Sequence, residues 1–117
     1  MGPNLPPLRS RELLVEHTIS LTAQYLRRVW PQELDGVRFE VAPYSLESSS
    51  GGVRRWQVFP AQRRIVFYRT PMERLTRLHR RDDFHRRMFV ESCVFRAVAE
   101  LLGKDPWELA PERFRHF

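Results

Sequence analysis

The side chains that could ligate a metal ion are few and scattered in this sequence. The four histidines are His17, His79, His85 and His116. No two of them stand three or four residues apart, the spacing that places two side chains on one face of a helix. A metal site assembled from His79, His85 and Glu100 is an alternative to the simpler interpretation, in which all four histidines lie on the surface.

The candidate nucleophiles are one cysteine and a run of serines at 48–50. Cys93 stands among Val90, Val94 and Ala97, so it is predicted to be a small buried hydrophobic residue and not a reactive thiol. The serines lie in a polar loop without the strand–turn–helix elbow that activates a catalytic serine. A single cysteine cannot form an internal disulfide, which fits a reducing compartment.

Arginine gives the strongest positive signal. The net charge is +6, and Lys104 is the only lysine among 20 basic residues. Six arginines in one tract could bind phosphates or an acidic protein surface: Arg74, Arg77, Arg80, Arg81, Arg86 and Arg87. Helical spacing places Arg74, Arg77 and Arg81 on one edge. The alternative is a solvated face whose arginines pair with nearby carboxylates. Aromatic residues do not alternate with these arginines, so a protein partner is favoured over nucleic acid.

Length and composition predict a single domain at 9–117, preceded by a disordered segment at 1–8. The chain has 117 residues, of which 42% are hydrophobic and 29% charged. No apolar run approaches the roughly 20 residues that span a bilayer, and the N-terminus has no apolar signal region. We therefore expect a cytoplasmic protein with no membrane partner.

Two long amphipathic helices are predicted to position these residues. The first runs from Arg11 to Val29 with Ser10 as N-cap, and its apolar positions are Leu14, Val15, Thr18, Ile19, Leu21, Tyr25, Leu26 and Val29. The second runs from Phe84 to Gly103, with Asp82 or Asp83 as N-cap and Gly103 in a left-handed C′ position. Its apolar positions are Phe84, Met88, Val90, Val94, Phe95, Val98, Leu101 and Leu102.

Three strands and two short helices complete the prediction. The strands are Val37–Val41, Arg54–Phe59 and Arg64–Tyr68, and the last is nearly all apolar, which favours the interior of the sheet. The short helices are Pro71–Leu78 and a terminal one from Pro106 to about Ala110, opened by the capping box of Asp105 and Glu108. The fold class is therefore α+β: a small mixed or antiparallel sheet with helices on one face.

The segments RIVFYRTPMERL (64–75) and ELLGKDPWEL (100–109), in this order around a long apolar helix, resemble the small bacterial zincin-like metallopeptidase domain family. The opening LPPLRSRELL (5–14) also looks like a divergent branch of it, and the resemblance covers about residues 8 to 110. It implies the minimal zincin-like fold, in which the long helix carries an HExxHxxG motif that binds zinc and hydrolyses peptides.

The motif itself is lost. Alignment on Gly103 places the two histidines of the motif at Arg96 and Glu100, and its glutamate at Ala97. The acidic pair that follows the motif falls on Asp105 and Pro106. Arginine does not ligate a cation, and alanine cannot take a proton from zinc-bound water. The resemblance therefore implies the fold without zinc and without peptidase activity. Arg96 and Glu100, one turn apart, are expected to form a salt bridge or a solvated helix edge.

The leading hypothesis is a degenerate zincin-like domain that binds a protein partner. The expected surface is the former cleft between the long helix and the sheet edge, bordered by Arg96, Glu100 and the loop at 45–52. One alternative is an enzyme of the family with a relocated active site, built from Glu100, Asp105 and a histidine. The other is an arginine-driven binder of nucleic acid or of the ribosome surface.

Overall fold

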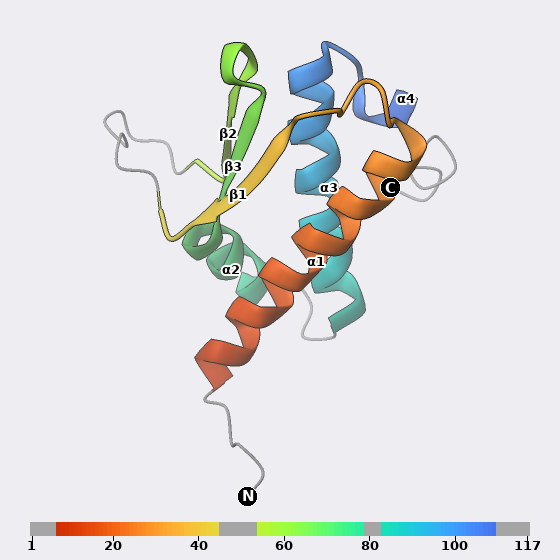
Figure 1. The fold of residues 1–117 in the computed structure, drawn as a ribbon. Helices are drawn as coiled ribbons and strands as arrows, with labels where there is room; N and C mark the ends of the chain where they lie inside the picture. The colour runs from red at the N-terminus through yellow and green to blue at the C-terminus, as the bar shows by residue number, and fades with distance from the viewer. Residues whose placement is uncertain (1–6, 45–53, 79–82, 110–117) are drawn as a thin grey trace, which may run out of the picture.

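The computed structural model describes residues 7–44, 54–78 and 83–109 (Figure 1). Along the chain these form α1 (Pro7–Val29), β1 (Arg38–Ala42), β2 (Trp56–Phe59), the 3-10 helix η1 (Pro60–Gln62), β3 (Arg64–Tyr68), α2 (Arg69–Leu78), α3 (Asp83–Leu102) and α4 (Pro106–Leu109). This order confirms the predicted α+β class. No helix of the described segments has both the length and the apolarity needed to cross a membrane.

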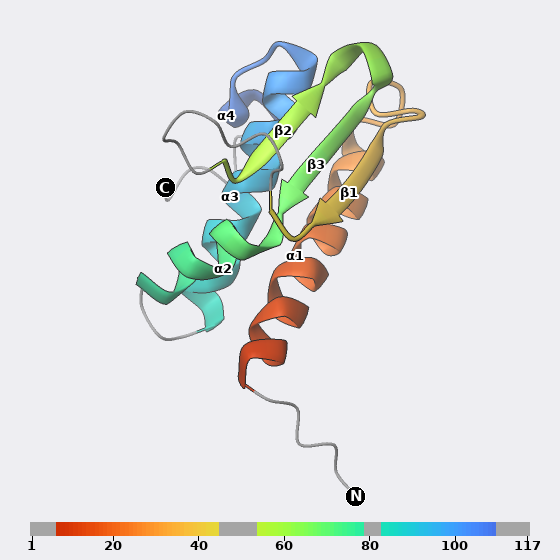
Figure 2. The ribbon, with the colours of Figure 1, turned by 90° about the vertical axis from the view of Figure 1, so that its left-hand side faces the viewer.

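The sheet is mixed, with the strand order β1-β3-β2. β1 pairs with β3 in parallel and β2 pairs with β3 antiparallel, so the predicted interior strand is central. Figure 2 shows the sheet facing the viewer, with α1 and α3 behind it. Ile65 and Phe67 of β3 are fully buried and belong to the core, and the ring of Phe67 stacks on that of Phe39. The helices therefore cover one face of the sheet, as predicted.

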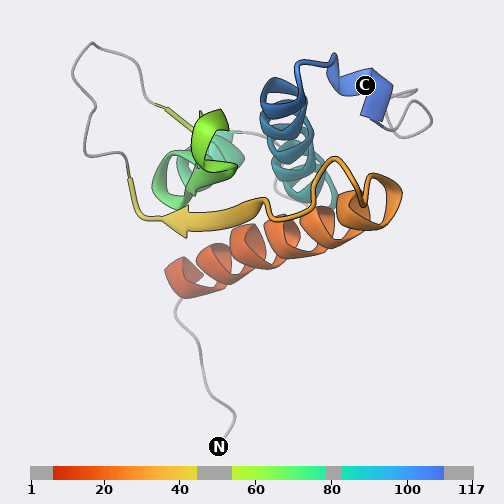
Figure 3. The ribbon, with the colours of Figure 1, turned by 45° about the horizontal axis from the view of Figure 1, so that its top comes forward.

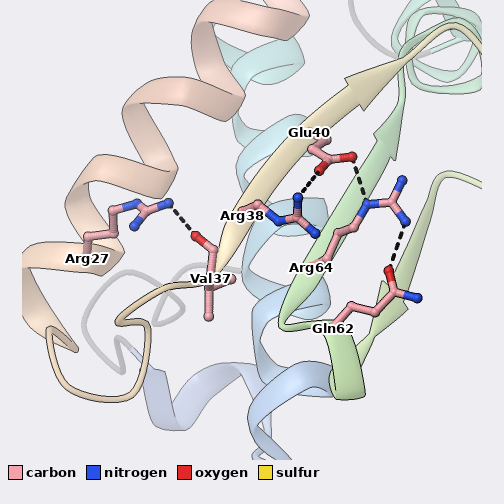
Figure 4. Close-up of polar contacts among 6 residues, drawn as sticks. All are labelled: Arg27, Val37, Arg38, Glu40, Gln62 and Arg64. Atoms are coloured by element: carbon pink, nitrogen blue, oxygen red, sulfur yellow. Dashed lines mark hydrogen bonds and ion pairs between the residues drawn. The ribbon is translucent and has the colours of Figure 1, made fainter.

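The opposite face of the sheet carries a chain of polar contacts (Figure 4). Arg64 donates from Nε to Glu40 Oε1 at 2.8 Å and from Nη1 to Gln62 Oε1 at 3.3 Å. Arg38 Nη1 lies 3.9 Å from Glu40 Oε2. These side chains are partly exposed, and ion pairs of this kind each contribute at most about 1 kcal/mol. They link the strands laterally but do not supply the core.

α1 begins earlier than predicted. It starts at Pro7, not at Arg11, so Ser10 is a helical residue and not the N-cap. Proline is compatible with the first helical turn because the backbone N–H that it lacks has no partner there. Leu21 and Val29 are 51% and 46% exposed, so the buried face is narrower than the apolar pattern indicated.

Other boundaries also differ by a few residues. β1 is displaced by one residue from the prediction, and β2 is two residues shorter. α2 begins at Arg69, two residues before Pro71, which still falls in the first turn. α3 begins at Asp83, whereas Asp82 lies outside the described residues. Phe84 is 65% exposed and so does not belong to the buried face of α3.

The end of α3 and the start of α4 follow the predicted local signals. Gly103 has φ +68°, the Lys104 N–H donates to Ala99 O at 2.9 Å, and the Gly103 N–H donates to Glu100 O at 3.4 Å. This pattern is a Schellman motif. The Asp105 N–H then donates to Glu108 Oε1 at 2.8 Å, which is the backbone half of a capping box.

Replacing Gly103 tests this helix end. Gly103→Ala places a Cβ on a left-handed residue and should lower the free energy of unfolding by about 1 kcal/mol. Gly103→Asn is the matched control and should lose less, because asparagine tolerates this conformation. Urea unfolding of both variants measures the difference. Equal stability of the alanine variant and the wild type would contradict the assignment.

Candidate functional site

The three motif positions lie on two different faces of α3. Arg96 and Glu100 are exposed, whereas Ala97 has no exposed surface and belongs to the core. Cys93, one turn before Ala97, is equally buried. The helix therefore directs one edge outward, and the row that holds Ala97 is packed. A carboxylate at position 97 would have no solvent and no room.

Glu100 connects α3 to the sheet. Its Oε1 accepts a hydrogen bond at 3.1 Å from the indole Nε1 of Trp56, the first residue of β2. Arg96 makes no hydrogen bond or ion pair with any residue that the structure describes. The predicted salt bridge between Arg96 and Glu100 is therefore wrong, and the alternative of a solvated edge holds for Arg96.

Arg55 lies beside the same contact between α3 and β2. Its guanidinium lies 5.5 Å from the centroid of the Trp56 ring and 5.9 Å from that of Phe89, a residue of α3. Such cation–π contacts contribute roughly 0.5–1 kcal/mol at partly exposed sites. We call the group of Arg55, Trp56, Phe89, Arg96 and Glu100 the α3–β2 seam. The loop at 45–52, expected to border it, lies outside the described residues.

Cys93 lies beneath the seam and is chemically inert at neutral pH. Burial raises the pKa of its thiol from 9.0 to about 11, although the nearby guanidinium groups of Arg55 and Arg96 lower it in part. A thiol with so high a pKa is almost wholly protonated near neutral pH and is a poor nucleophile. The predicted role of Cys93 as a buried hydrophobic residue is confirmed.

The donors around the motif positions do not fit a zinc site. Arg96 offers no lone pair, Ala97 offers no donor, and one oxygen of Glu100 already accepts the Trp56 N–H. Within the segments that the structure describes, no three histidine, cysteine, aspartate or glutamate residues are grouped to hold a metal ion. The alternative site with His85 and Glu100 fails on distance, because 15 residues of one continuous α-helix separate them by about 22 Å. His79 lies outside the described residues.

The arginine tract is only partly visible. Arg74 on α2 and Arg87 on α3 are exposed, and Arg86 is half-buried and engaged in a contact. Arg77 lies on α2, which ends at Leu78, while Arg80 and Arg81 lie outside the described residues. The single helical edge predicted for Arg74, Arg77 and Arg81 therefore stays a prediction, because Arg81 lies outside the described residues.

Sequence reasoning missed three residues of the seam, Arg55 and Trp56 of the β2 segment and Phe89 of α3. An arginine followed by a tryptophan at the start of a strand was the available signal, but nothing in the sequence indicates which helix would lie against that strand. Asp105, aligned with the acidic pair of the family, precedes α4, and its backbone N–H donates to Glu108 Oε1. Comparisons of the chain with protein-family models, with curated proteins and with solved structures find no match.

The buried thiol gives stability a pH dependence. The pKa of Cys93 is about 11 in the folded chain and 9.0 in the unfolded chain. The neutral thiol therefore contributes fully to the free energy of unfolding below pH 9, and this contribution is lost as the pH rises towards 11. The free energy of unfolding should fall by about 2 kcal/mol between pH 8 and pH 10.5 through this group. Denaturant unfolding of the wild type and of Cys93→Ala at both pH values measures it. Parallel profiles for the two proteins would contradict the assignment.

Proposed function

We propose that this chain is a zincin-like domain without peptidase activity that functions by binding another protein. The zincin-like relationship is supported by the motifs at 64–75 and 100–109 and by an element order that agrees with the expected one. The loss of activity is supported by the side chains at the motif positions. The observation on which it rests is the complete burial of Ala97, at the position of the catalytic glutamate.

The local chemistry supports binding better than a relocated active site. Glu100 is exposed and held by Trp56, so it lies in neither an apolar nor an enclosed environment that would adapt it to proton transfer. Of the described histidines, His17 is exposed on α1, and His85 lies about four turns from Glu100 along α3. Between Glu100 and these two histidines, therefore, no acid–base pair is placed to act on a substrate.

Zinc content tests the loss of the metal site. The chain should contain far less than one zinc ion after chelator-free purification without a histidine tag, measured by mass spectrometry of the metal. The double variant Arg96→His with Glu100→His is the positive control, because two exposed imidazoles one turn apart should bind added zinc. One tightly held zinc ion per wild-type chain would overturn the proposal.

Restoring the motif carboxylate should cost stability and should not restore activity. Ala97→Glu places an unpaired carboxylate and one extra methylene in a packed row, so we expect a loss of at least about 2 kcal/mol in the free energy of unfolding. Ala97→Ser is the matched control and should lose clearly less, because serine is small and uncharged. Thermal and urea unfolding compare the two. A glutamate variant as stable as the serine variant would show that position 97 faces an open cleft.

A further inference from the structure

One edge of the sheet has backbone groups that the described part of the chain leaves without a partner. β1 pairs with β3 along one edge, and none of the described strands pairs with its other edge. The Arg38 N–H donates to Arg63 O at 3.0 Å, so Arg38 bonds towards β3. Because successive residues of a strand direct their N–H and C=O groups to opposite edges, those of Phe39 and Val41 point to the outer edge.

The outer edge of β1 lies beside α1. Val37 lies two residues before Phe39, so its carbonyl also faces the outer edge. This carbonyl accepts a hydrogen bond from Arg27 Nη2 at 2.6 Å (Figure 4). Figure 3 shows β1 running alongside α1 in the opposite direction. One outward group therefore already has a partner from α1, whereas those of Phe39 and Val41 have none among the residues described here.

A groove of about 220 Å³ lies between α1 and this edge. Ile19 and Ala23 of α1 and Phe39 and Val41 of β1 give it apolar walls, and Val41 is 37% exposed. Ser20, also from α1, lies on its polar rim. An unprotected apolar edge of this kind invites pairing with another strand. We call this feature the α1–β1 groove.

The two ends of the groove differ in charge. At one end Glu16 is paired with Arg69 at 2.9 Å, which neutralises it. At the other end Arg27 lies over the Phe39 ring at 4.9 Å and donates to a neutral carbonyl, so its positive charge has no carboxylate partner in the described segments. Glu16 and Arg27 are separated by about 16 Å along α1, the length of about five extended residues.

We infer that the α1–β1 groove binds one extended segment of a partner protein by strand addition to β1. The segment bonds to the free backbone groups of Phe39 and Val41, places an apolar side chain against Ile19, and directs a carboxylate to Arg27. This inference rests on the proposed function and names its docking surface. A second copy of this chain fits less well, because the carboxylates of its described α1 and β1 residues beside the groove, Glu16 and Glu40, are already paired with Arg69 and Arg64.

In the binding test, the full chain is the target against which peptides are selected from a displayed library of random eight-residue sequences. We expect enrichment of peptides with β-branched and apolar residues and an acidic residue at one end. Hydrogen exchange should show that a synthetic copy of an enriched peptide protects the amides of Phe39 and Val41. An unenriched library, protection confined to the α3–β2 seam, or a dimer that forms through β1 would each overturn the inference.

The free backbone N–H of the edge strand is tested by Val41→Pro. An edge strand tolerates proline where the N–H faces outward, so the variant should fold, yet it lacks a donor for strand addition. Affinity for the selected peptide should fall at least about tenfold. Val41→Thr is the control, since it keeps the N–H and the shape of the side chain, and it should bind nearly as the wild type does. Equal affinity of the two variants would overturn strand addition.

The position of the peptide is tested by blocking the groove from α1. Ser20→Arg places a long side chain in the groove without disturbing the core and should abolish binding. Leu21→Arg, on an exposed position outside the groove, is its control and should not. Both variants add one positive charge, so a general electrostatic effect would change the peptide affinity of both alike. Equal affinities of the two variants would contradict binding in the groove.

The charge of the segment is tested by a double-mutant cycle. Wild type should bind a peptide with aspartate at its acidic end about tenfold more tightly than the same peptide with asparagine, and Arg27→Gln should remove this difference. An unchanged preference in the variant would exclude Arg27 as the carboxylate partner. Zinc on α3 would overturn the proposed function without affecting the groove, whereas failure of these variants would overturn the groove alone.

Discussion

The burial of one face of α3 is the constraint on which the other parts of the structure depend. Val90, Val94 and Val98 have no exposed surface, and neither have Cys93 and Ala97 between them. α3 packs against α1 on one side and against β2 on the other, so this row is closed by both. Polar groups are then confined to the remaining edge of the helix. That confinement determines what the motif positions can do, because a group buried in such a row must be apolar or fully partnered.

The exposed edge of α3 contacts the β2 segment of the sheet. Glu100 accepts the indole N–H of Trp56, and Arg55 covers the rings on either side of this contact. This hydrogen bond to a charged acceptor joins β2 to α3 through two residues that are 44 positions apart in the sequence. At the positions that the zincin resemblance assigns to catalysis, Glu100 is bonded to β2, Ala97 lies in the core and Arg96 faces solvent.

The sheet leaves a different region open. Among the described strands β3 is paired on both edges and β1 on one, and α1 lies beside the other edge of β1. The contact from Arg27 to Val37 holds this arrangement and keeps the helix at the distance that leaves a groove. Backbone groups without partners, apolar walls and an unneutralised guanidinium then occur together. Their combination, more than any single residue, supports the proposed binding of an extended segment at this edge.

Local patterns in the sequence were sufficient for β3 at Arg64–Tyr68, for the helix end at Gly103 and for the capping of α4 by Asp105, because each depends on residues within a few positions of one another. Apolar periodicity also indicated which side of each long helix is buried. Periodicity cannot indicate what lies opposite that side. Only the tertiary structure decided that Glu100 bonds to Trp56 and that α1 leaves the edge of β1 open. Those outcomes depend on contacts between distant segments, whose geometry is set by the packing of the whole core.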